Sequence, residues 1–162
     1  MSTSRRAAAV VVRAWLVAAT MDITAAITYY PLTANVRVVR ILQGIASGLL
    51  GARAFQGGLA TAVLGVALHY MIALFWTLLF FAAARAFKPL LRNLVATGIA
   101  YGIVVWAVMN LVVLPLSNVR HAPFNARQAI VAAVILVICI GLPIAGIIGR
   151  HERAAAGTVE RV

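Results

Sequence analysis

The chain has 162 residues and a mean hydropathy of +1.03, with 64% apolar and only 10% charged side chains. Soluble domains carry roughly 45–50% apolar and about 25% charged residues, so this composition excludes a soluble enzyme and a disordered chain. The single cysteine, Cys139, excludes a disulfide scaffold. What remains is an integral membrane protein with several α-helical spans.

Four apolar stretches are long enough to cross a bilayer, because about 20 apolar residues span its hydrocarbon core. They comprise residues 7–30, 57–84, 94–117 and 128–149. The first contains Arg13 and Asp22, and Pro31 is expected to end it. A cleaved signal peptide is the alternative for this stretch, with Arg5 and Arg6 at its basic start. We favour a span, because Arg13 would interrupt the apolar core of such a peptide.

Residues 37–54 form a shorter amphipathic segment between the first two spans. Its uncharged part, residues 41–52, gives roughly 18 Å of helix, which cannot cross a core of roughly 30 Å. Arg37, Arg40, Gln43 and Ser47 recur at helical spacing and predict one polar face. An interfacial helix is therefore favoured. A re-entrant half-helix is the alternative, because the segment also contains Gly44, Gly48 and Gly51.

These segments predict an all-α integral membrane fold with four transmembrane helices plus a short amphipathic interfacial or re-entrant helix. Residues 1–162 are expected to form a single membrane domain. Residues 153–162 are expected to be frayed, since they offer little that could pack against the rest of the chain.

The basic residues predict the orientation. Four spans place both termini on one side, and the larger set of lysines and arginines falls on that side: Arg5, Arg6, Arg13, Arg85, Lys88, Arg92, Arg150, Arg153 and Arg161. The smaller set falls on the far side: Arg37, Arg40, Arg53, Arg120 and Arg127. Because cytoplasmic loops carry the excess of Lys and Arg, we expect a multi-pass protein of the bacterial inner membrane with both termini cytoplasmic.

The same placement explains the net charge of +11. Basic residues at span ends contact lipid headgroups, so the bilayer, and not nucleic acid, is the expected partner. Those expected to lie at the interface are Arg37, Arg40, Arg53, Arg85, Lys88 and Arg92.

Each of the first three spans has a face of small residues, and each of these faces carries one strongly polar residue. These residues are Asp22, His69 and Asn110, and at about 1.5 Å per residue all three lie within about 8 Å of the membrane midplane. An ionisable residue inside a span is costly and normally faces the bundle interior or a water-filled cavity. We therefore predict an intramembrane site with Asp22 as proton or cation site, His69 as relay partner and Asn110 as hydrogen-bond donor.

This hypothesis requires the side chains of Asp22 and His69 to lie within direct or one-water hydrogen-bonding reach. Candidate lining residues are Thr61, Gly65, Trp76, Gly102 and Trp106. The alternative is that the three polar residues only hold the helices together by hydrogen bonds. The fourth span carries small residues and no ionisable one. It is predicted to pack against the others, with a kink at Pro143.

No motif for hydrolysis, phosphate binding or metal ligation is present. The chain is therefore not expected to be an enzyme, and no cofactor or metal is expected.

The second span, GGLATAVLGVALHYMIALFWTLLFF, is followed by a basic turn and a Gly-rich third span that ends near a proline, GIAYGIVVWAVMNLVVLPLS. Over roughly residues 57–117 this arrangement resembles the YagU-like bacterial inner-membrane proteins. The resemblance implies a small multi-span protein without an assigned activity, and it implies no functional residues.

The function predicted from the sequence is that of a small transporter-like or channel-like protein with a polar site around Asp22, His69 and Asn110. Four spans leave little interior for a path, so a homodimer or a larger membrane complex is expected. The alternative is a structural or accessory subunit that packs on a larger membrane complex or on lipid and has no transport activity.

Overall fold

The computed structural model describes residues 3–119 and 125–159, and these are helical with short connections and no strand. The α-helices are α1 (Thr3–Ala34), α2 (Val38–Leu50), α3 (Gly58–Ala86), α4 (Leu94–Val108), α5 (Leu114–Leu116), α6 (Ala126–Leu136) and α7 (Leu142–Val159). Two 3-10 helices, η1 (Gly51–Gln56) and η2 (Lys88–Leu91), and two π-helical segments, η3 (Met109–Val113) and η4 (Val137–Gly141), join them. The predicted all-α fold is confirmed.

Within these described residues, five helical stretches are long and apolar enough to cross a membrane. They are Arg5–Ala34, Val38–Gln56, Gly58–Ala86, Leu94–Leu116 and Ala126–Ala156. The second reaches this length only by joining α2 to η1 across Gly51, whose φ of 60° interrupts the regular helix. The structure thus contains one more candidate span than the four that were predicted.

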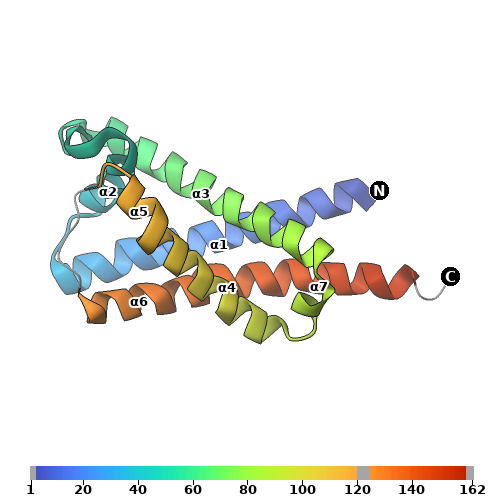
Figure 1. The fold of residues 1–162 in the computed structure, drawn as a ribbon. Helices are drawn as coiled ribbons and strands as arrows, with labels where there is room; N and C mark the ends of the chain where they lie inside the picture. The colour runs from blue at the N-terminus through green and yellow to red at the C-terminus, as the bar shows by residue number, and fades with distance from the viewer. Residues whose placement is uncertain (1–2, 120–124, 160–162) are drawn as a thin grey trace.

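The long helices lie side by side, and both ends of the chain are at the same end of the bundle (Figure 1). Helix α2 and η1 are at the opposite end. The core is narrow and consists mainly of small residues and a few large ones, such as Ala18 of α1, Phe80 of α3 and Ile144 of α7. Large apolar side chains such as Leu111 and Phe75 are instead exposed, as expected for a surface that faces lipid.

Helix α1 continues beyond its predicted end. Pro31 lies inside its last turn, and the helix ends at Ala34, before Asn35 with a φ of 51°. Proline there removes one hydrogen bond near a helix end, and a left-handed Asn is a common residue just after a helix. The predicted end at residue 30 was therefore wrong by one turn.

A proline follows each π-helical segment by two residues. Pro143 has no N–H for the carbonyl of Cys139, which lies at the centre of η4. Pro115 has the same relation to Leu111, at the centre of η3. Because a proline ring clashes with the carbonyl four residues earlier, the wider π turn gives that carbonyl room. At Pro143, where the sequence predicted a kink, the structure has this π-helical segment two residues before the proline.

Glycines bring α4 and the α6–η4–α7 helix into close contact. A Cβ added to Gly141 would lie 2.1 Å from the carbonyl oxygen of Gly98, and one added to Gly102 would lie 2.5 Å from the Cα of Val137. No larger residue fits at either position without displacing backbone. The small faces predicted for the third and fourth spans therefore face each other.

Helix α2 presents only part of the predicted polar face: Arg37 and Arg40 are exposed, but Gln43 and Ser47 are buried. Gln43 and Ser47 are each only 3% exposed, because Gln43 Nε2 donates to the carbonyl oxygen of Gly58 at 2.9 Å and Ser47 Oγ donates to that of Gly44. Leu49 on the same helix is 60% exposed. A backbone carbonyl at the start of α3 and one within α2 thus replace water as partners of these two side chains, and the exposed surface of α2 is partly apolar.

The C-terminal segment is helical to Val159 and not frayed from Arg153; residues 160–162 lie outside the described part of the chain. The guanidinium of Arg153 donates from Nε to the carbonyl oxygen of Leu91 and from Nη2 to that of Arg92 at 2.8 Å. These carbonyls end η2, so Arg153 joins α7 to the α3–α4 connection, a contact that sequence analysis missed.

We expect Arg153→Ala to destabilise the protein by about 1 kcal/mol, since it removes two hydrogen bonds from a charged but exposed group. Backbone amides of residues 154–159 should exchange faster with deuterium. Arg150→Ala is the matched control, because Arg150 is an exposed basic residue of the same helix without a hydrogen bond among the described residues. Equal exchange in both variants would show that the Arg153 contacts do not hold this end of α7.

Candidate intramembrane site

Asp22 and His69 come together from α1 and α3. Oδ2 of Asp22 lies 3.9 Å from Nδ1 of His69, and the two side chains are 19% and 13% exposed, respectively. This separation is longer than a direct hydrogen bond but within reach of one bridging water. The two ionisable residues on the small faces of the first two spans therefore face each other.

The other nitrogen of His69 fixes the tautomer. Nε2 lies 2.9 Å from the carbonyl oxygen of Ala19, one turn before Asp22 on α1. Because a carbonyl oxygen can only accept, Nε2 carries a proton. Nδ1 is therefore the nitrogen that can gain or lose a proton, and it is the one directed at the Asp22 carboxyl group.

A cavity of about 180 Å³ adjoins the pair. Its walls are otherwise largely apolar and come from α1, α2, α3, α4, η3, α6 and η4: Asp22, Ile45, His69, Ile72, Ala73, Trp76, Val105, Met109, Leu136 and Ile140. This volume holds a few water molecules and is smaller than the roughly 300–1,000 Å³ of pockets for organic ligands. The cavity thus suits water and a small ion.

Neighbouring polar side chains strengthen the contact between α1 and α3. Tyr70 shares a hydrogen bond with Thr20 at 2.9 Å between hydroxyl oxygens, and its carbonyl oxygen accepts one from Trp15 Nε1 at 2.7 Å. Sequence analysis did not include these residues in the site. Tyr70 directly follows His69 and Thr20 lies two residues before Asp22 in the chain, which was the available signal, although Tyr and Trp in a span also fit the membrane interface.

Asn110 is not part of this cluster. Its Nδ2 donates to the carbonyl oxygen of Trp106 in its own helix at 2.8 Å, and it does not line the cavity with Asp22 and His69. The prediction followed four-residue steps from Gly102, and each such step turns about 40° further around a helix of 3.6 residues per turn. Met109 reaches the cavity instead.

Of the predicted lining residues, Trp76 borders the cavity. Thr61 Oγ1 donates to the carbonyl oxygen of Ala54 at 2.6 Å. A Cβ added to Gly65 would lie 1.9 Å from the Leu42 carbonyl oxygen. Thr61 and Gly65 therefore allow α3 to pack against η1 and α2. Gly102 likewise allows α4 to pack against Val137. The Nε1 of Trp106 is buried without a hydrogen-bond partner among the described residues.

The basic residues predicted to meet headgroups are all exposed: Arg37, Arg40, Arg53, Arg85, Lys88 and Arg92. Two of them lie over aromatic rings, with Arg40 Cζ 5.2 Å from the centre of the Phe55 ring and Arg85 Cζ 5.4 Å from that of Phe81. Such contacts hold the guanidinium group beside apolar surface. This is the position expected of a basic residue at the membrane interface.

Comparisons with protein-family models, with curated proteins and with solved structures found no match. The resemblance to the YagU-like proteins therefore stays a prediction.

Proposed function

We propose that this protein is a small transporter-like or channel-like protein of the bacterial inner membrane in which Asp22 and His69 bind and pass a proton or a small cation. The observation that carries the proposal is the 3.9 Å approach of Asp22 Oδ2 to His69 Nδ1 beside a small cavity. Ionisable pairs of this kind inside membrane spans mark proton and ion paths.

The chemistry of the pair suits reversible proton binding. The Nε2 proton of His69 is donated to the Ala19 carbonyl oxygen. One further proton can then reside on the Asp22 carboxyl group or on His69 Nδ1. Both arrangements carry the same net charge, so transfer between them needs no compensating ion. A cation that binds the Asp22 carboxylate would compete with this proton.

In the proposed topology four spans cross the membrane and both termini are cytoplasmic. The segments are α1, α3, α4 with its η3 and α5 extension, and α6 with η4 and α7. Helix α2 contributes about 20 Å of helix, less than the core thickness. The burial of Gln43, which donates to the Gly58 carbonyl oxygen of α3, together with Ile45 at the cavity wall, favours a re-entrant over an interfacial helix.

An accessory role in a homodimer or a larger membrane complex is the second candidate. The candidate span Leu94–Leu116 favours this role. Only 11% of its most apolar stretch is buried, against 22–28% in the other four candidate spans. Such a face offers a partner helix more surface than the others do.

Proton flux into reconstituted vesicles tests the first candidate. With a potassium diffusion potential as driving force and a pH-sensitive dye inside, the wild type should acidify the vesicles faster than empty ones. Asp22→Asn should reduce the rate at least about tenfold, because it removes the exchangeable proton. Asn110→Ala is the matched control, since Asn110 lies outside the cluster, and it should keep most of the flux. Equal rates for wild type and empty vesicles would favour the accessory role.

A further inference from the structure

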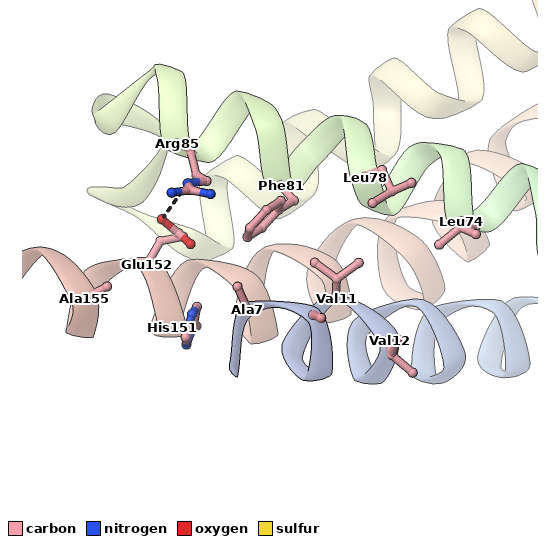
Figure 2. Close-up of a pocket in the computed structure, with 11 residues that line it drawn as sticks. Ala7, Val11, Val12, Leu74, Leu78, Phe81, Arg85, His151, Glu152 and Ala155 are labelled. Carbon is pink, nitrogen blue, oxygen red and sulfur yellow. Dashed lines mark ion pairs between the residues drawn. The ribbon is translucent and has the colours of Figure 1, made fainter. Parts of the chain in front are cut away.

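A second, larger pocket lies near the end of the bundle that carries both termini. Its volume is about 670 Å³, and α1, α3 and α7 form its walls. Figure 2 shows its two parts: apolar side chains such as Val12, Leu74 and Leu78 along the helices, and Arg85 with Glu152 at one end. The pocket shares no lining residue with the cavity beside Asp22 and His69.

From its charged end to its inner end, the pocket is about as long as one acyl chain within a leaflet. From Leu74 to Arg85, α3 rises about 16 Å, which is about half of the roughly 30 Å hydrocarbon core. Val12 and Leu78 are 46% and 47% exposed, so the wall is open to whatever surrounds the bundle. In a bilayer, a hydrocarbon chain is the group that meets such a surface.

The charged end is built from opposite charges. Nε of Arg85 lies 4.0 Å from Oε2 of Glu152, and the Glu152 side chain is only 9% exposed. Arg85 is also held over the ring of Phe81, which places the guanidinium where the apolar wall ends (Figure 2). Among the described residues the Glu152 carboxylate accepts no hydrogen bond, and a nearly buried carboxylate with one distant ion pair is incompletely compensated.

We propose that this pocket binds a phospholipid with a primary ammonium headgroup, of the phosphatidylethanolamine class. The phosphate lies on Arg85, the ammonium donates to the Glu152 carboxylate, and one acyl chain follows Leu78 and Leu74 toward the membrane interior. The alternation of charges along the headgroup matches that of the two side chains. A quaternary ammonium, as in phosphatidylcholine, cannot donate this hydrogen bond.

The test compares two lipids of equal net charge, so that attraction by the many basic residues at this end cancels. Delipidated full-length protein is titrated with phosphatidylethanolamine or phosphatidylcholine of the same acyl chains, and bound lipid is counted by native mass spectrometry. The wild type should prefer phosphatidylethanolamine by about threefold to fivefold, as one additional hydrogen bond of up to ~1 kcal/mol gives. Glu152→Gln should remove this preference and should not weaken binding of the anionic phosphatidylglycerol.

Leu78→Trp provides a second test that leaves both charged groups in place. It fills the apolar part at an exposed position, so it should lower the binding of both zwitterionic lipids while the thermal stability of the lipid-free protein is kept. Arg150→Gln, which removes an exposed charge outside the pocket, should leave the preference unchanged. Equal binding of the two lipids by the wild type, or a preference that survives Glu152→Gln, would overturn the proposal. Neither result depends on whether Asp22 and His69 move protons.

Discussion

Gly141→Ala is expected to destabilise the protein by about 1–3 kcal/mol, the usual cost of forcing a methyl group into a packed interior. The new Cβ would lie 2.1 Å from the carbonyl oxygen of Gly98 and 2.8 Å from the backbone nitrogen of Gly102. Both neighbours are backbone atoms, which cannot rotate away as a side chain can. Relief therefore requires α4 to move away from η4. Titration with a denaturing detergent, followed by circular dichroism, measures the loss.

Gly146→Ala is the matched control in the same continuous helical segment. A Cβ at Gly146 meets no atom within 4 Å, so this substitution should be neutral or stabilise the protein by up to ~1 kcal/mol through helix propensity. If both variants unfolded at the same detergent concentration, the close approach of Gly98 and Gly141 would not contribute to stability.

The second large effect is a loss of proton flux that is not additive between substitutions of Asp22 and His69. In the vesicle flux assay, His69→Gln should lower the rate at least about tenfold, like Asp22→Asn, because a relay needs both proton carriers. The double variant should be no slower than either single variant, since groups that act as a unit give non-additive losses.

If Asp22 and His69 acted independently, the fold-reductions in flux of the two single variants would multiply in the double variant. Purified variants should first be compared by circular dichroism, because His69 also donates to the Ala19 carbonyl oxygen and helps to join α1 to α3. Multiplied losses in well-folded variants would contradict the shared site, even if each single variant were slow.

Sequence analysis predicted the membrane-type helical fold and the meeting of Asp22 with His69 from simple regularities. Small residues at four-residue steps identify the faces that pack in lipid, and an ionisable residue on such a face has few places to lie except toward another helix. Gly98 and Gly141 were likewise assigned to packing faces. These inferences depend only on a regular helical period, which α1 and α3 keep.

The failures occur where four-residue steps drift away from the helical period or where backbone provides hydrogen-bond partners. Asn110 is eight residues after Gly102, so on a helix of 3.6 residues per turn it is rotated by about 80° from the glycine face. Gln43 was assigned to a water-facing surface, but it donates to the Gly58 carbonyl oxygen. No spacing pattern marks a free carbonyl on a neighbouring helix. The contacts of Arg153 with two backbone carbonyls were missed for the same reason, and because residues 153–162 were expected to be frayed.

The hydrogen bond from His69 Nε2 to the Ala19 carbonyl oxygen has a consequence for the rate law of any flux through this site. With that nitrogen engaged, His69 takes up and releases protons only at Nδ1, on the side of Asp22 and the adjoining cavity, unless the imidazole ring turns and breaks the bond. A path that continues through His69 to its other side would then include one ring rotation for each proton, a step whose rate does not increase with the driving force. Flux through the protein should therefore saturate as the proton gradient rises, whereas flux through a continuous water column would keep increasing in proportion to it.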